Sequence, residues 1–236
     1  MSDSAAATPD RLGETGALYR GLSWVVTVLT PVALVLTAVR LLVTPAFVQL
    51  EYRTPGFPDD PYGFSREERL YWSDIAREYL LNDAGIEFLG DLRFEDGSPV
   101  YNERELGHMI DVKYVLGQAL ALWVASLSAL VILGFWALRG GWRREYRRGL
   151  ARGGWWTVVF VAVVIPLVLV GFGVFFVAFH EVFFDPGTWV FSFSDTLIRL
   201  FPERFWRDAF LAIALISLAG GLALGVGLRE RNYSLT

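Results

Sequence analysis

Four long runs of apolar residues divide the chain and predict four membrane-spanning helices. The runs cover residues 22–43, 114–138, 155–179 and 210–228, and the last belongs to a helix predicted over 207–228. A helix needs roughly 20 apolar residues to cross the hydrocarbon core, and each run meets or nearly meets that length. The first run is too long for the apolar region of a signal peptide, so we interpret it as an anchored helix. The fold class predicted is therefore all-α integral membrane.

The polar stretch between the first two runs, residues 44–113, predicts a small and mainly helical cap. Residues 54–63 are rich in Pro and Gly and predict turns, and residues 94–98 predict a further turn. Ser65 with Glu68 has the spacing of a capping box at a helix start. The helix-like run that follows has an apolar stripe made of Leu70, Tyr71, Ile75, Tyr79 and Leu80. A region of roughly seventy residues has little core of its own, so we expect the cap to rest on the spans.

The placement of charge predicts the orientation in the membrane. The loop 139–154 contains six arginines and one glutamate, and short loops rich in Arg stay in the cytoplasm. The tails 1–21 and 229–236 then lie in the cytoplasm as well, whereas the cap and the loop 180–206 lie outside. We therefore predict a multi-pass protein of the bacterial cell membrane with both termini inside. In the last span, Gly221 and Gly225 have the spacing that favours close helix packing.

The overall composition agrees with a membrane protein and narrows the possible chemistry. The mean hydropathy is +0.41, with 54% hydrophobic and 19% charged residues. There are no cysteines, which excludes disulfides, thiolate metal ligands and a thiol nucleophile. The net charge of −4 comes with no basic face outside the membrane, so we expect the bilayer as partner and no nucleic acid.

The chain has only two histidines, and the predicted topology brings both to the outer interface. His108 precedes the second span by six residues, and His180 follows the third span by one. On a continuous helix Glu105 and Asp111 lie at i−3 and i+3 from His108, so either could orient its imidazole. A lone interfacial His is more often a packed residue than a catalyst, but the convergence of both favours a shared site. Candidate substrate contacts nearby are Arg40, Gln118, Asp185 and Asp195.

Three chemical uses fit such a pair of histidines. Two histidines with a carboxylate could hold a metal, but the compact spacing of known zinc motifs is absent, and we expect no metal or cofactor. A serine hydrolase needs a nucleophilic serine, and no serine of the chain lies in a GxSxG-like setting. A histidine could instead act as general base for a nucleophile that the substrate supplies. This last use requires no Cys, Ser or metal.

Three short motifs resemble a family of bacterial four-span membrane proteins that includes the lipoprotein intramolecular transacylase. They are NERELGHMIDVK at 102–113, FHEVFF at 179–184 and DTLIRLFPERFW at 195–206. The resemblance implies a shift of an acyl chain on a lipoprotein whose N-terminal cysteine carries a diacylglyceryl group. The sn-2 chain would move to the α-amino group and give the lyso-form. The resemblance also assigns His108 as the base and His180 as the second histidine of the site.

Two other functions compete with this one. The protein could be a non-catalytic accessory protein that meets a partner through its acidic outer region. It could also be a membrane hydrolase that releases a fatty acid to water, which would require a water beside His108. The sequence alone leaves transfer and hydrolysis open, and it leaves the oligomeric state unknown.

Overall fold

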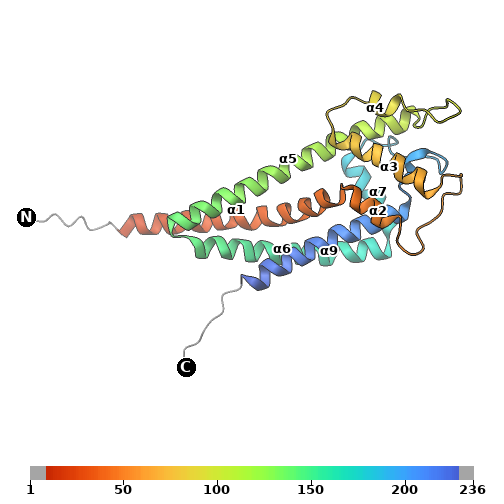
Figure 1. The fold of residues 1–236 in the computed structure, drawn as a ribbon. Helices are drawn as coiled ribbons and strands as arrows, with labels where there is room; N and C mark the ends of the chain where they lie inside the picture. The colour runs from red at the N-terminus through yellow and green to blue at the C-terminus, as the bar shows by residue number, and fades with distance from the viewer. Residues whose placement is uncertain (1–8, 229–236) are drawn as a thin grey trace, which may run out of the picture. The chain divides into compact units, whose positions relative to one another are not determined.

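The structure, a computed structural model, describes residues 9–228, with side chains from residue 15 onward. This part of the chain contains nine helices and one isolated β-bridge, and Figure 1 shows their arrangement along the chain. The helices are α1 (Pro9–Leu42), α2 (Pro45–Glu51), α3 (Arg66–Leu81), α4 (Glu87–Gly90), α5 (Glu103–Gly140), α6 (Arg143–Val170), α7 (Phe172–Phe183), α8 (Thr196–Leu200) and α9 (Glu203–Gly227).

Four of these helices, α1, α5, α6 and α9, are long and apolar enough to cross a membrane. The prediction of an all-α protein with four candidate spans is therefore confirmed. The third predicted run differs in one respect, because the structure breaks it into two helices. α6 ends at Val170 and α7 begins at Phe172, with Gly171 at φ −135° and ψ 45° between them.

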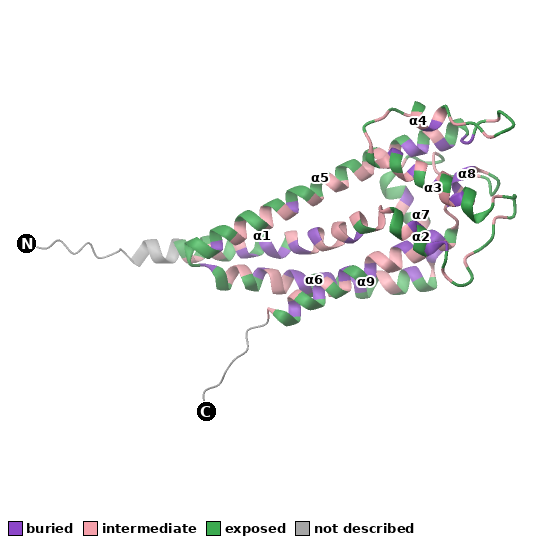
Figure 2. Cartoon of the chain, in the orientation of Figure 1, coloured by how far each residue is buried: buried purple, intermediate pink, exposed green. Residues whose placement is uncertain are grey.

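The described chain forms two compact units. The first, which we call the site unit, comprises Leu36–Leu122 and Ala162–Leu215. The second, the bundle unit, comprises the remaining described residues. Each of the four long helices contributes residues to both units. Figure 2 shows that α5 has few buried positions along most of its length, as expected for a helix with a large face toward lipid.

Glycines on α6 bring the helices of the bundle unit into close contact. A Cβ added at Gly153 would lie 2.5 Å from the Cβ of Thr30 on α1. A Cβ added at Gly154 would lie 2.6 Å from the carbonyl oxygen of Gly221 on α9. Small residues that let two backbones approach are characteristic of helix pairs in membranes. The close packing predicted at Gly221 is therefore confirmed, and its partner is another glycine.

The cap forms as predicted and shares its core with the helices beside it. Ser65 and Glu68 make a reciprocal capping box at the start of α3. The turn at 94–98 closes a short hairpin, in which the Phe94 amide donates to the Ser98 carbonyl at 2.9 Å. The buried core joins α3, α4, α5 and α8 and contains Ala76, Tyr79, Leu89, Val100, Tyr101, Met109, Leu197 and Leu200. Residues 44–113 thus gain a core that they could not build alone.

A pair of carboxyl groups, one buried and one half-buried, connects α2 to α9. Glu51 is buried, and its side chain shares a hydrogen bond with Asp208, which also accepts from the Arg204 Nε at 3.2 Å. Burial, the charge of Asp208 and this hydrogen bond raise the pKa of Glu51 to about 7, although Arg204 and Thr54 act in the opposite direction. Two carboxyl groups in contact hold one proton between them, because two adjacent negative charges repel.

This pair predicts that stability depends on pH through Glu51. The unfolded chain releases the proton near pH 4.5 and the folded chain near 7, so stability falls as pH rises across that window. We expect Glu51→Gln to raise the melting temperature at pH 8 by a few degrees, from a gain on the order of 1–3 kcal/mol. The gain should shrink at pH 5. Thermal unfolding in detergent at both pH values measures it, with the exposed Glu95→Gln as control. Equal shifts for the two variants would contradict the shared proton.

The glycine contacts predict a strong effect of a single methyl group. Gly153→Ala would place a Cβ within 2.7 Å of the Thr27 carbonyl as well as against Thr30, and backbone atoms cannot yield cheaply. We expect a loss of about 1–3 kcal/mol in the free energy of unfolding. Gly117→Ala is the matched control, because it adds the same methyl group in α5 where nothing lies within 4 Å. That control should be neutral or slightly stabilising. Equal destabilisation by both variants would overturn the packing argument.

Candidate functional site

The site begins at the first turn of α5, which its own sequence caps. The Asn102 amide donates to Glu105 Oε2 at 2.9 Å, and the Glu105 amide donates to Asn102 Oδ1 at 3.0 Å. The side chain of each residue thus satisfies the backbone of the other, as in a capping box with Asn in place of Ser. This cap fixes where the helix starts, and His108 follows Glu105 by three residues on the same helix face.

The carboxylate of Glu105 also connects α5 to α8. Its Oε1 accepts from the Leu197 amide at 2.7 Å, and the side chain is only 1% exposed. Nearby, the Thr196 hydroxyl donates to the Val100 carbonyl at 2.5 Å. Both carboxylate oxygens of Glu105 are therefore engaged by backbone amides at the starts of two helices, where a negative charge is favourable. Glu105 acts on His108 through the position of the helix, because its own oxygens bond elsewhere.

The two histidines lie side by side. The ring centroids of His108 on α5 and His180 on α7 are 6.0 Å apart, with an angle of 23° between the ring planes. Each residue is 8% exposed. Two imidazolium ions at this separation would repel each other strongly in a site of low polarity. The pair therefore holds at most one extra proton, which suits a group that accepts a proton and passes it on.

Aromatic rings from α7 and the following segment surround both imidazoles. The ring centroid of Phe176 is 4.0 Å from that of His180, and the ring of Trp189 is 4.8 Å from it. The rings of Phe184 and Phe191 lie 4.9 and 5.4 Å from that of His108. These rings exclude water and hold the imidazoles in place, so the environment of the pair is apolar.

The hydrogen bonds of the site determine what its nitrogens can do. His180 Nδ1 lies 2.7 Å from the Phe176 carbonyl, which can only accept, so Nδ1 carries a hydrogen and Nε2 has a lone pair in the neutral ring. α7 is outside the four candidate spans, and burial there lowers the pKa of His180, partly opposed by this hydrogen bond. Within the described chain, His108 Nδ1 and Trp189 Nε1 are buried without a hydrogen-bond partner. They are two of eight such side-chain atoms in the described chain, and they are the two that belong to the histidine pair and the rings around it.

The other predicted site residues have separate positions. Asp111 is half-buried on α5, and in residues 15–228 no hydrogen bond joins it to His108. Four predicted substrate contacts likewise form no hydrogen bond to either histidine in this range. They are Arg40 in the last turn of α1, Gln118 exposed on α5, Asp185 exposed after α7, and Asp195, which accepts from the Ser192 amide at 2.9 Å. Asp195 occupies the N-cap position of α8.

Trp189 is the site residue that the sequence did not indicate. It lies in the segment between α7 and α8, which carries no motif for a donor, and the chain has nine tryptophans in total. The sequence did contain one indication of a donor. Trp189 follows His180 by nine residues, and its indole N–H can only donate a hydrogen bond, for which an apolar segment offers few acceptors. The described residues contain no group of three or more His, Cys, Asp or Glu suited to a metal.

Comparison with known proteins identifies the family. Residues 24–206 match the family model for the lipoprotein intramolecular transacylase Lit. An uncharacterized protein of Aquifex aeolicus (strain VF5) is 30% identical over 217 residues, which cover 90% of this chain and 95% of that protein.

Solved structures agree with the family at the level of the fold. The in meso structure of the membrane integral lipoprotein intramolecular transacylase Lit from Bacillus cereus matches with a TM-score of 0.77 at 23% identity. The match covers 91% of this chain and 95% of that one. A structure of the same protein with one histidine replaced by Arg matches with a TM-score of 0.72 at 23% identity, over 93% of this chain and 94% of that one. The chain described here thus belongs to the lipoprotein intramolecular transacylase family of membrane-integral acyltransferases.

Proposed function

We propose that this protein moves the sn-2 acyl chain of a diacylglyceryl-modified lipoprotein to the α-amino group of its N-terminal cysteine, with His108 as general base. The observation that supports this proposal most directly is the pair of buried imidazoles 6.0 Å apart. We also propose that the reaction takes place at the extracytoplasmic face of the bacterial cell membrane. The basic loop between α5 and α6 supports this orientation, because short arginine-rich loops stay in the cytoplasm.

The reaction needs one proton to be moved from nitrogen to oxygen. The free amine attacks the ester carbonyl carbon, a C–N bond forms, and the nitrogen of the tetrahedral intermediate then carries an excess proton. His108 takes that proton and returns it to the departing glyceryl oxygen as the C–O bond breaks. The products are an amide and a free hydroxyl, and no other reactant is consumed. An α-ammonium has a pKa of about 8, so part of it is already the free amine at neutral pH, and His108 has only the proton of the intermediate to move.

The free lone pairs of the two histidines support these roles. His108 Nδ1 has no partner among residues 15–228, so it is available as an acceptor. The Phe176 carbonyl fixes the proton of His180 on Nδ1, which leaves Nε2 with a lone pair. The single proton taken from the amine stays on His108, so the pair carries one positive charge and not two. The neutral His180 can then accept a hydrogen bond from the substrate amine through Nε2.

Trp189 supplies a donor for the oxyanion. Its indole N–H can only donate, it is buried without an acceptor in the described chain, and its ring is 4.8 Å from that of His180. A fixed donor in an apolar site stabilises a developing negative charge far more than the same donor in water. The substrate carbonyl oxygen would accept the hydrogen bond that this N–H lacks in the resting protein. Because each histidine is only 8% exposed, the ester reaches them when neighbouring aromatic side chains move aside.

The central prediction is that His108→Ala abolishes transfer. Without the imidazole the intermediate keeps its excess proton and the glyceryl oxygen leaves poorly, so we expect a loss of at least about 100-fold. The protein would be expressed in a bacterium that lacks other lipoprotein N-acylating enzymes. Mass spectra of N-terminal lipoprotein peptides would then be compared at matched membrane abundance. Wild type should give the N-acyl, monoacylglyceryl peptide, and His108→Ala should not.

The exposed Glu103→Gln, also in the first turn of α5, is the control for this experiment and should keep wild-type activity. A peptide that loses one chain without gaining an N-acyl group would identify a hydrolase instead. Unchanged diacylglyceryl peptide in the presence of wild-type protein would favour the accessory function.

The assignment of Trp189 predicts a defect in turnover rather than in binding. Trp189→Phe keeps an aromatic ring next to His180 but removes the N–H, so we expect kcat to fall on the order of 100-fold with little change in KM. Trp72→Phe is the matched control, because Trp72 packs in the cap core, with its ring 5.7 Å from that of Phe94. It should leave kcat unchanged. A wild-type kcat in Trp189→Phe would exclude the indole as an oxyanion donor.

A further inference from the structure

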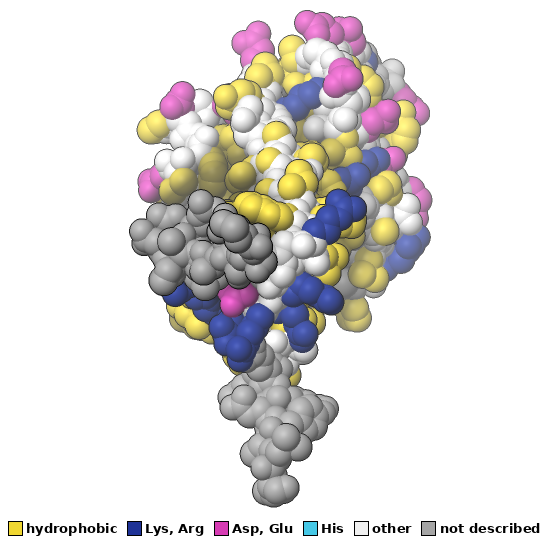
Figure 3. All heavy atoms as spheres, turned by 90° about the vertical axis from the view of Figure 1, so that its left-hand side faces the viewer, with side chains coloured by type: hydrophobic (Ala, Val, Ile, Leu, Met, Phe, Trp, Pro, Cys, Tyr) yellow, Lys and Arg dark blue, Asp and Glu magenta, His cyan; other side chains and the backbone are white. Residues whose placement is uncertain are grey.

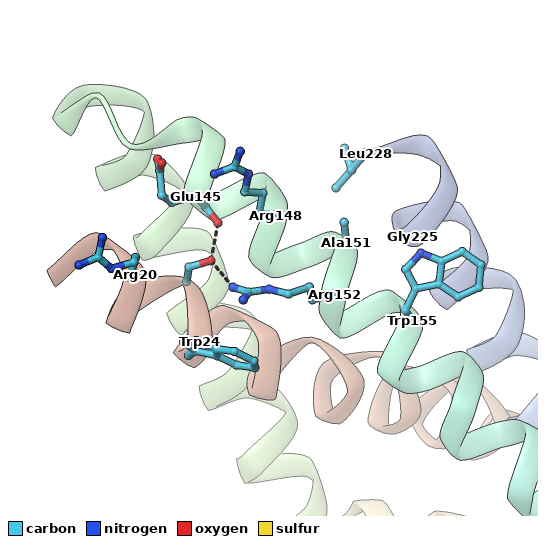
Figure 4. Close-up of a pocket in the computed structure, with 10 residues that line it drawn as sticks. Arg20, Trp24, Glu145, Arg148, Ala151, Arg152, Trp155, Gly225 and Leu228 are labelled. Atoms are coloured by element: carbon cyan, nitrogen blue, oxygen red, sulfur yellow. Dashed lines mark hydrogen bonds between the residues drawn. The ribbon is translucent and has the colours of Figure 1, made fainter. Parts of the chain in front are cut away.

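A cavity of about 830 Å³ lies in the bundle unit, among α1, the first half of α6 and the end of α9 (Figure 4). It shares no residue with the histidine site. Its wall combines charge with large aromatic surfaces, and the residues that matter here are Arg20, Trp24, Glu145, Arg148, Arg152 and Trp155. Three arginines and one glutamate give the wall a net positive charge. The remaining lining is small or apolar, so the cavity is amphipathic.

Arg152 is held as a fixed cation in this wall. Its Nη2 donates to the Ser23 hydroxyl at 2.6 Å, and that hydroxyl donates to the Glu145 carbonyl at 2.6 Å, as the dashed lines in Figure 4 show. The guanidinium carbon lies 4.2 Å from the ring centroid of Trp24. A guanidinium stacked on an indole and anchored by a hydroxyl loses little freedom when it binds an anion.

No acid of the described chain neutralises Arg152. Its Nε is buried without a hydrogen-bond acceptor, and none of its contacts in this part of the chain is with a carboxylate. Glu145 is the one acidic residue of the wall, and Figure 4 shows its carboxylate directed away from Arg152. A half-buried arginine without a counterion is unfavourable, because a partly desolvated charge needs a partner. The contacts of Arg152 therefore favour an anion as the ligand of this cavity.

The surroundings indicate an anion that carries hydrocarbon. The cavity lies at the ends of three candidate spans, and tryptophans such as Trp24 and Trp155 prefer the boundary between lipid and water. Figure 3 looks onto this end of the bundle unit, where Lys and Arg side chains gather. A volume of about 830 Å³ is large for a single phosphate ion but suits a headgroup with part of its glycerol backbone.

We propose that this cavity binds the phosphate-bearing headgroup of an anionic phospholipid. The phosphate oxygens bond to Arg152 and Arg20, and the glycerol and first methylenes lie against Trp24 and Trp155. Basic pockets between membrane helices bind anionic headgroups by this chemistry. The bound lipid contacts α1, α6 and α9 together, so it stabilises the bundle unit by mass action.

The test uses the full-length protein, purified in neutral detergent, with phosphatidylglycerol or phosphatidylcholine added at matched concentration. Native mass spectrometry counts retained lipids, and thermal unfolding gives the change in melting temperature. We expect preferential retention of phosphatidylglycerol and a higher melting temperature with this lipid alone. Arg152→Gln should weaken its retention about tenfold, since a charge-assisted hydrogen bond is lost. Arg147→Gln removes the same charge from the same helix at an exposed position outside the cavity, and it should bind like wild type.

Arg20→Gln is a second test variant, because it removes a wall charge and leaves the bond between Arg152 and Ser23 intact. This variant should also weaken the retention of phosphatidylglycerol. If Arg152→Gln unfolds, the retention measured with Arg20→Gln tests the proposal in its place. Equal retention of the two lipids would overturn the proposal. Equal weakening by Arg147→Gln would overturn it too, because the effect would then come from overall charge. A rise in melting temperature with glycerol 3-phosphate equal to that with phosphatidylglycerol would identify a free phosphate ester as the ligand instead.

Discussion

The arrangement of the histidine site depends on one buried carboxylate, that of Glu105. It closes the cap of α5 and accepts a hydrogen bond from the Leu197 amide at the start of α8, so the starts of two helices meet at one carboxyl group. The apolar packing around it does not specify such a register, because hydrophobic contacts are not directional. Two hydrogen bonds with fixed geometry are directional. They determine where His108 lies along α5 and where the segment carrying Trp189 and Phe191 ends.

The same site combines two demands that normally conflict. Aromatic packing around His108 and His180 stabilises the site unit, whereas the proposed reaction requires polar atoms that the protein itself leaves unsatisfied. The unpartnered nitrogens of His108 and Trp189 are where this conflict is visible, since each costs free energy in the resting protein. A substrate ester and amine would satisfy them. The cost is tolerated because the surrounding core is shared among four helices of the site unit.

The sequence predicted the parts of this structure that local rules control. The presence of four long apolar helices, the Ser65–Glu68 box and the turn at 94–98 follow from short-range patterns, and all three predictions were correct. The proximity of His108 and His180 followed from topology, because two spans with ends at the same interface place those ends together. The hydrogen-bond partners of Glu105 and Glu51 could not be predicted, because Leu197 and Asp208 are distant from them in sequence. In addition, an acid three residues from a histidine suggests a contact with the imidazole rather than with a backbone amide. The break at Gly171 was missed because the apolar run continues through it.

Burial of the histidine pair bears on the choice between transfer and hydrolysis. An amide product requires the α-amine to attack the ester carbonyl before a water molecule does. At a solvent-exposed site, water would be in large excess over the amine. Imidazoles that are 8% exposed among aromatic rings reduce that excess, because few water molecules fit beside them. The amine does not have to enter the site separately from solvent, since it belongs to the same molecule as the ester and its effective concentration is already high. An open site would favour hydrolysis, so the apolar surroundings of the pair favour transfer.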